Sequence, residues 1–260
     1  NVEICTVVGK DLDIKKKVNN FAKKIKSKIF IEKDKVTVRK KRFVEEGYNK
    51  KLSEVYYIDD DFLSTLNFKK INQYLNKNLH RFDVVIVIDY GHGFINQEIY
   101  KTLLKKSKFL AINCQTNSAN LGFNLITKYK KCDYVCIDEP ELRLASSNNY
   151  DEIIKILKGN LTKKIKCKNF TITRGRKGST SYLKSKILHT PALISEKVLD
   201  TIGAGDVFLV ITSLLYSAKA NQLVTNLVGN IAGALKVDIL GHSKSINKSD
   251  FHSILKHILK

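Results

Sequence analysis

The chain has 260 residues, of which 43% are hydrophobic and 27% are charged, a composition typical of a globular protein that buries one full core. It contains no run of about 18 uncharged apolar residues, which argues against a membrane-spanning helix. The first residues lack the basic and apolar regions of a signal peptide, so we expect no membrane partner.

The net charge of +21 raises the question of a nucleic-acid partner, because clustered cations attract phosphate backbones. The lysines are instead spread over nearly every predicted helix, which is typical of solvated faces. No basic patch interleaved with aromatic residues occurs. We therefore expect no nucleic-acid partner, although the positive field favours an anionic substrate.

The 5 cysteines are irregularly spaced and indicate neither a disulfide framework nor a zinc site. Cys132-x-x-x-Cys136 lacks the second ligand pair that zinc requires. This usage is typical of a reducing compartment, and we expect a cytoplasmic protein.

Short apolar runs bounded by polar residues recur along the chain and predict buried parallel strands. They lie at residues 4–8, 83–88, 109–113, 134–137 and 170–173. Segments with helical spacing alternate with them at 12–26, 62–79, 99–104 and 153–161, and the C-terminal third reads as helices at 204–217, 223–237 and 250–259. This alternation predicts an α/β fold with a parallel sheet covered on both faces.

Residues 29–44 break this rhythm, because apolar and polar residues alternate there. Ile29 and Ile31 precede the break Lys33-Asp34-Lys35, and Val36 and Val38 follow it. The pattern predicts a β-hairpin at about 28–46, inserted into a single domain over 1–260. Such a small antiparallel sheet is suited to act as a lid that excludes water from a site.

The stretch Asp200-Thr201-Ile202-Gly203-Ala204-Gly205-Asp206 opens a long apolar helix. A glycine turn at a helix start leaves backbone amides unpaired and, with the helix dipole, predicts an anion site. Asp206 falls in the first helical turn, where its carboxylate can accept a proton from a hydroxyl beside the bound anion. The alternative is an ordinary glycine turn with Asp206 as a helix-start residue.

All fixed positions of this string match D-T-x-G-A-G-D, and it resembles the signature of the PfkB, or ribokinase-like, carbohydrate kinases. The resemblance implies a ribokinase-like three-layer sandwich with a mostly parallel central sheet and a small antiparallel lid. It also implies an ATP-dependent phosphotransferase that uses ATP and Mg²⁺ and acts on a hydroxyl of a sugar or sugar phosphate. Asp206 would be the general base, and Gly203, Ala204 and Gly205 would form the anion hole.

The run Thr173-Arg174-Gly175-Arg176-Lys177-Gly178 resembles the family's T-x-G-x-x-G nucleotide loop. Carried over, Thr173, Gly175 and Gly178 would line the ATP site. Asn230 falls where the family brings a helix near the adenine, and a surface helix residue is an equal alternative.

Asp138-Glu139-Pro140-Glu141 resembles the N-x-x-E motif that organises magnesium and phosphates in the family. Glu141 fits the acidic position, and Asp138 replaces the asparagine while keeping an oxygen ligand that magnesium accepts. The alternative is a plain helix start with Pro140 in the first turn.

Two further segments resemble the heptose-7-phosphate kinases of this family. Thr37-x-x-Lys40-x-Arg42 is similar to a stretch of their lid and implies that Lys40 or Arg42 binds a sugar phosphate. An exposed strand of alternating charge is the alternative. Asp89, in a segment similar to S-D-Y-x-K-G, ends a strand and is expected to face the substrate.

The sequence also departs from the family. Asn113, Cys114 and Gln115 stand where sugar kinases carry an Asp-centred motif, and the text from Gln115 to Asn120 is similar to kinase-like modules fused to nucleotidyltransferase domains. The family's early G-D-x-x-x-D strand is absent before Val8, and the chain has no methionine. We therefore expect a fragment that lacks its N-terminal strand or strands.

Two functions remain open at this point. One is the enzyme, and the other is a catalytically weak kinase-like module that binds nucleotide or sugar phosphate and regulates a fused nucleotidyltransferase. Assembly as a homodimer or as part of a bifunctional polypeptide is compatible with both.

Overall fold

The computed structural model describes residues 1–11, 16, 17, 20, 25–45, 51–59, 63–117, 120–193, 198–241 and 243–258. The helix that the sequence predicts at 12–26 falls for the most part outside these residues. The chain divides into two compact units, residues 1–79 with 91–105 and residues 80–90 with 106–260. Among the described helices, none has both the length and the apolar character needed to cross a bilayer.

The larger unit, residues 80–90 with 106–260, is built on a six-stranded sheet with the order β10-β9-β8-β7-β6-β5. Its parallel strands are β5 (Val85–Asp89), β6 (Leu110–Cys114), β7 (Tyr134–Asp138) and β8 (Asn169–Thr173). The strands β9 (Ser179–Leu183) and β10 (Lys186–Thr190) continue the sheet in antiparallel order. The predicted mostly parallel α/β sheet is confirmed, and β5 to β8 all end at the same edge.

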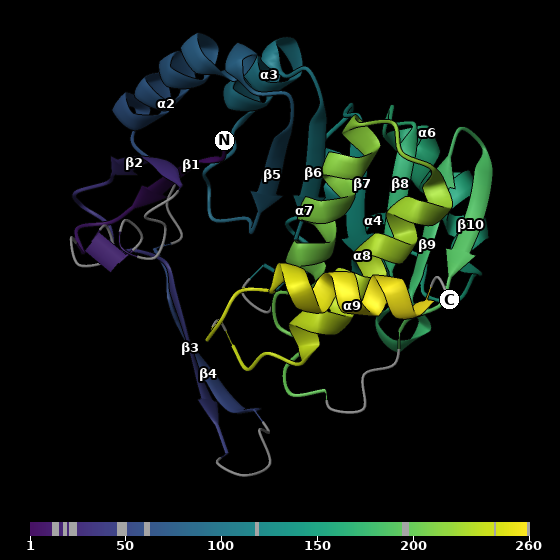
Figure 1. The fold of residues 1–260 in the computed structure, drawn as a ribbon. Coiled ribbons are helices and arrows are strands. Elements are labelled where there is room, and N and C mark those ends of the chain that lie inside the picture. Colours follow the sequence, from purple (N-terminus) through teal and green to yellow (C-terminus); the bar gives the residue numbers. More distant parts are fainter. Residues whose placement is uncertain are drawn as a thin grey trace. The chain divides into compact units, whose positions relative to one another are not determined.

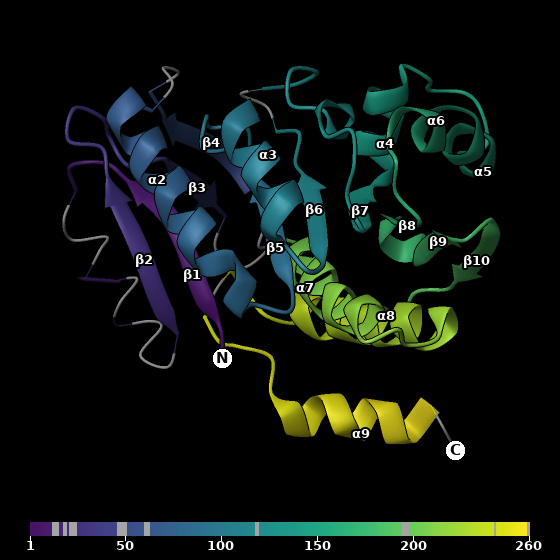
Figure 2. The ribbon, with the colours of Figure 1, turned by 90° about the horizontal axis from the view of Figure 1, so that it is seen from above.

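Helices cover both faces of this sheet (Figure 2). On one face lie α7 (Ala204–Ser217) and α8 (Gln222–Val237), with α9 (Lys248–Ile258) outside α8. On the other face lie α4 (Glu139–Ser146), α5 (Ile153–Ile156), the π-helical turn η3 (Leu157–Leu161) and α6 (Thr162–Lys164). The short 3₁₀ turns η2 (Ile126–Lys128) and η4 (Gly175–Lys177) lie in the connections.

The core of this unit forms where α7 packs on the middle of the sheet. Ala111, Tyr134 and Cys136 of the strands meet Phe208, Leu209 and Tyr216 of the helix, and all are buried. The rings of Tyr134 and Tyr216 stand 4.7 Å apart. The apolar run that follows Asp206 therefore becomes the central helix of the unit, as its lack of charge predicts.

The smaller unit begins with two parallel strands, β1 (Glu3–Val8) and β2 (Lys26–Ile31). Helix α2 (Thr65–Asn78) packs on β2 through an edge-to-face contact of Phe30 and Tyr74 at 6.1 Å. The smaller unit also contains α3 (Gln97–Lys106) as far as residue 105. The 3₁₀ turn η1 (Leu79–Arg81) has its first residue in the smaller unit and its other two in the larger unit.

The antiparallel hairpin of this unit consists of β3 (Arg39–Val44) and β4 (Lys51–Tyr57), which form a separate two-stranded ribbon (Figure 1). The hairpin predicted at 28–46 was therefore wrong, because its two halves do not pair with each other. Residue 46 itself lies outside the described residues. Residues 26–31 pair in parallel with β1, and Thr37 instead accepts a hydrogen bond from the Gly9 amide at 2.9 Å. Alternation of side chains identifies a strand but does not identify its partner.

Replacing Leu209 by alanine is expected to destabilise the protein by about 2–5 kcal/mol, because this fully buried side chain would leave a cavity between α7 and the sheet. Urea unfolding measures the change. Leu223→Ala is the matched control, since that leucine is 54% exposed and its loss should stay within about 0.5 kcal/mol. Equal losses for the two variants would contradict the position of the core.

Candidate active site

Helix α7 begins at a left-handed glycine turn. Gly203 is its N-cap with φ 79°, and no side chain caps the helix. The turn before it is braced by Asp200, whose two carboxylate oxygens accept hydrogen bonds of 2.9 Å from the amides of Ile202 and Gly241. A Cβ on Gly205 would meet no atom within 4 Å. Protein packing therefore does not require this glycine, and the backbone is open to a ligand there.

The Asp206 carboxylate lies in the first turn of α7, half-buried beside the ends of β5 and β6. Gln115 donates from Nε2 to its Oδ1 at 2.9 Å, and the Tyr90 hydroxyl donates to its Oδ2 at 3.4 Å. Burial, followed by the charge of Asp206, raises the pKa of Tyr90, which keeps this hydroxyl a donor. The carboxylate thus meets side chains at the edge of the sheet rather than the apolar interior.

Asp89, the last residue of β5, is only 4% exposed. Its carboxylate pairs with Lys128 and accepts a hydrogen bond from the Tyr129 hydroxyl at 2.5 Å. A contact between Asp89 and substrate stays a prediction, because protein groups engage this carboxylate in the structure. Its evident role is to brace the segment around η2.

Asp138 and Glu141 form a reciprocal capping box at the start of α4, which sits directly after β7. Asp138 Oδ1 accepts from the Glu141 amide at 2.7 Å, and Glu141 Oε2 accepts from the Asp138 amide at 2.9 Å. Glu141 Oε1 accepts from the amide of Thr116 at 3.1 Å. Burial, and then the charge of Asp138, raises the pKa of Glu141 from 4.5 to about 7.

Of these two carboxylates, Asp138 is the one that fits a magnesium ion arriving with phosphates. Mg²⁺ in phosphate-binding sites typically takes one or two protein carboxylates and fills its remaining positions with water and phosphate oxygens. Asp138 is exposed, whereas Glu141 is 8% exposed and its two oxygens already accept backbone hydrogen bonds. Within the described residues no three acidic, histidine or cysteine side chains gather into a metal site of their own.

The loop after β8 lies beside α4, because Thr173 and Asp138 are partners in the parallel ladder. Gly178 has φ 84°, and a Cβ there would lie 2.1 Å from the carbonyl oxygen of Thr190. The Arg174 amide donates to the Gly178 carbonyl at 2.8 Å and closes the loop. One tight turn, at the same sheet edge as Asp138, thus contains Thr173, Gly175 and Gly178, the residues that the family resemblance assigns to the ATP site.

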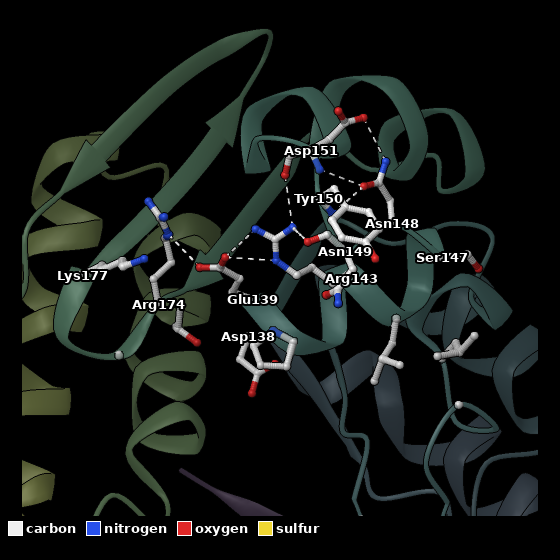
Figure 3. A pocket seen from close by; sticks show the side chains of 16 residues that line it. Asp138, Glu139, Arg143, Ser147, Asn148, Asn149, Tyr150, Asp151, Arg174 and Lys177 are labelled. Carbon is white, nitrogen blue, oxygen red and sulfur yellow. Dashed lines mark hydrogen bonds and ion pairs between the residues drawn. The ribbon is translucent and has the colours of Figure 1, made fainter.

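An open cavity of about 1410 Å³ lies over this edge, lined among others by Asp138, Thr173 and Gly175 (Figure 3). Glu139 crosses it as a bridge, with its Oε1 2.7 Å from Arg143 Nη2 and its Oε2 3.1 Å from Arg174 Nε. The Glu139 carboxylate, held between two guanidinium groups, therefore joins helix α4 to the loop after β8.

Asn230 is buried in α8 and is not the surface residue that the alternative expected. Its Nδ2 donates to the carbonyls of Thr190 and Pro191 at 3.2 and 2.8 Å. It braces the chain after β10, and a contact with adenine stays a prediction.

Lys40 and Arg42 lie on β3 of the smaller unit. Both pair with Glu54 of β4, at 3.1 and 2.8 Å. A role for either in binding a sugar phosphate stays a prediction, and such a ligand has to compete with this carboxylate.

The larger unit thus gathers Asp89, Asp138, Thr173 and Asp206 at the carboxyl edge of the sheet, where α/β proteins bind ligands. The sequence did not identify Gln115, Tyr90 and Glu139 as parts of the site. Each stands within one residue of a strand end, and that position was the signal available to find them.

A glycine turn that Asp200 braces opens helix α7 without a side-chain cap, beside a carboxylate at this edge of an α/β sheet. Helix starts of this kind are suited to bind anionic groups. The model of the pfkB family of carbohydrate kinases matches residues 67–237. The chain belongs to this family.

Curated relatives named "Bifunctional protein HldE" match most of the chain. The protein of Pelobacter propionicus is 22% identical over 250 residues, 93% of this chain and 49% of the relative. That of Helicobacter pylori strain P12 is 25% identical over 256 residues, 90% of this chain and 52% of the relative. The chain therefore spans about half the length of these relatives.

Solved structures share the ribokinase-like fold. Phosphofructokinase-2 of Escherichia coli in complex with potassium has a TM-score of 0.80 at 10% identity, covering 99% of this chain and 82% of that one. Ribokinase of Thermotoga maritima has a TM-score of 0.73 at 19% identity, covering 98% and 81%. The expected ribokinase-like fold is thereby confirmed.

The raised pKa of Glu141 predicts a pH dependence of stability in magnesium-free buffer. The folded protein binds the Glu141 proton more tightly than the unfolded chain does. The contribution of Glu141 to the free energy of unfolding therefore falls as the pH rises from about 4.5 to about 7. The stability of the protein relative to a Glu141→Gln variant should fall across this window in urea titrations. Exposed Glu98→Gln is the control, and parallel curves for wild type and Glu141→Gln would contradict the assignment.

Proposed function

We propose that the chain transfers the γ-phosphoryl group of ATP to a hydroxyl of a sugar or sugar phosphate, with Asp206 as general base and the turn Gly203-Ala204-Gly205 as anion hole. One observation carries the proposal: the Asp206 carboxylate stands in the first turn of an uncapped helix, and amide donors and a proton acceptor therefore lie side by side. Phosphoryl transfer needs these two groups at one place.

In the proposed reaction the acceptor hydroxyl gives its proton to Asp206 while its oxygen forms the new bond to the γ-phosphorus. The bond from that phosphorus to the bridging oxygen breaks, and ADP leaves with the electron pair. The amides at the start of α7, aided by the helix dipole, bind the oxygens of the migrating group and offset their charge. Asp206 later loses the proton to solvent.

The nucleotide is proposed to lie along the edge that Asp138, Thr173 and Gly175 line, within the open cavity. Asp138 would hold Mg²⁺ together with phosphate oxygens, and the ion would supply charge neutralisation. Glu141 would act through the capping box that sets the position of Asp138. The backbone turn of Gly175 to Gly178 would face the nucleotide.

A sugar phosphate is the favoured acceptor class, because the strongly cationic chain attracts an anionic substrate. The relatives are named bifunctional proteins and are about twice as long as this chain. We infer that the chain works as the kinase part of such a bifunctional polypeptide. Lys40 and Arg42 of the smaller unit are the candidates to bind the phosphate group of the sugar phosphate, which would displace Glu54 from them.

A kinase-like module that binds ligands without turnover and regulates a fused domain is the second candidate. The departure that favours it is Asn113-Cys114-Gln115, which stands where sugar kinases carry an Asp-centred motif. The two functions differ in one measurement. A regulatory module binds ATP but releases no ADP with any of ribose, fructose 6-phosphate or a heptose 7-phosphate.

Asp206→Asn is expected to reduce phosphoryl transfer to the best of these acceptors by roughly two to four orders of magnitude, the effect of losing a general base. Coupled release of ADP measures turnover, and calorimetry checks that ATP still binds. Asp83→Asn is the control, since Asp83 belongs to an exposed surface pair of the same unit. Full activity of the Asp206 variant would falsify the proposed base.

Gly205→Ala tests whether the glycine is needed for phosphate binding rather than for stability. A Cβ there meets no protein atom within 4 Å, and alanine is the better helix former, so the thermal midpoint should stay unchanged or rise. Turnover should nevertheless fall at least about tenfold, because the methyl group occupies the approach to the helix amides. Wild-type turnover in a stable Gly205→Ala protein would count against a phosphate bound at this turn.

A further inference from the structure

Gln115 contacts the proposed base, although the reaction described above gives it no part. It directly follows β6, and its Nε2 donates to Asp206 Oδ1 at 2.9 Å. The bond joins residues 91 positions apart in the chain. An amide donor in this place favours the ionised, proton-accepting form of the carboxylate.

The backbone of Gln115 is held from both sides. Its amide donates to the Asp89 carbonyl at 2.9 Å, and its carbonyl accepts from Asn124 Nδ2 at 2.9 Å. The next residue, Thr116, donates from its amide to Glu141 and from its hydroxyl to the Asn124 carbonyl at 3.2 Å. Four hydrogen bonds therefore fix the dipeptide that carries the side chain.

The partners of this dipeptide are themselves fixed. Asn124 is 4% exposed and also donates to the Asp89 carbonyl at 3.0 Å. The Asp89 side chain is buried against Lys128 and Tyr129, and Glu141 belongs to the capping box of α4. Such a chain of buried, satisfied polar groups holds its members in one arrangement. The position of the Gln115 amide is thus set by the ends of β5 and β6 and by α4.

We propose that Gln115 is a positioning residue, which fixes one oxygen of Asp206 and thereby orients the other toward the acceptor hydroxyl. The inference rests on the proposed function of Asp206. A carboxylate free to rotate presents its basic oxygen in the reactive geometry only part of the time. Asp206 is held at Oδ1 by Gln115 at 2.9 Å and is contacted at Oδ2 by the Tyr90 hydroxyl at the longer distance of 3.4 Å, so Gln115 makes the shorter of the two contacts that set the direction of Oδ2. Gln115 touches neither substrate nor phosphate in this role.

Other titratable groups also act on Asp206. Tyr90 contacts it from the end of β5, and the charge of Asp206 is felt by Glu141 of α4 and by Cys136 of β7. The hydrogen bonds that hold the Gln115-Thr116 dipeptide use no atom of the Gln115 side chain, so a substitution there removes only the contact with Asp206 directly. An altered pH profile in a Gln115 variant therefore reports the lost or altered amide contact.

Gln115→Met tests the contact, because methionine keeps the length of the side chain and removes the amide. With ATP and the most active of ribose, fructose 6-phosphate and a heptose 7-phosphate, kcat should fall about 10- to 100-fold, the cost of a misplaced reacting group, while KM for ATP stays unchanged. Gln115→Glu should shift the acid limb of the kcat profile to higher pH, because a second carboxylate disfavours the ionised form of Asp206. The same two substitutions at exposed Gln73 of α2 are the matched controls and should leave both quantities unchanged.

Wild-type kcat in Gln115→Met overturns the inference. So does a loss of kcat that only matches a loss of folded protein and leaves the acid limb of Gln115→Glu unmoved, because a purely structural residue behaves in that way. Asp206→Asn, assayed in parallel, separates the two levels of the argument. If that variant is inactive while the Gln115 variants behave as wild type, the positioning role alone fails; if it is fully active, the base and the positioning role fail together.

Discussion

The start of helix α7 is the constraint around which the site is organised. A helix leaves the amides of its first turn without partners inside the helix, and proteins usually satisfy one of them with a polar side chain at the N-cap. Here the N-cap is Gly203, which has no side chain to offer. Asp200 braces the turn from behind instead, and the burial of Phe208 and Leu209 fixes the helix on the sheet. The amides keep their positions because the rest of the unit holds them.

The same unit couples this helix to the strand ends. Gln115 and Thr116 form a link from Asp206 on one side to Glu141 on the other. The proposed base Asp206 and the capping-box residue Glu141 thus both contact one dipeptide. They come from α7 and α4, which cover opposite faces of the sheet. A buried polar network of this kind gives specificity of geometry, and the loss of one member is felt by the others.

Much of the larger unit could be predicted from the sequence. Continuous apolar runs marked the parallel strands, and a chemically distinctive string marked the helix start at Gly203 to Asp206. The hairpin was misplaced because alternation carries no information on which strand pairs with which, and β2 found its partner in β1. The contacts of Gln115 and the ion pairs of Glu139 were also beyond reach, because they join residues whose proximity is decided by the order of strands in the sheet.

The bridge made by Glu139 contributes to the electrostatic character of the cavity, which Asp138, Asp151 and Lys177 also line. Two guanidinium groups, of Arg143 and Arg174, face a single carboxylate, so one of their positive charges is already compensated within the protein. A polyanion bound as proposed would meet one net positive charge from these three side chains rather than two bare cations. Glu139 is thus a built-in counter-ion for two arginines at the edge of the sheet where we propose that the nucleotide binds.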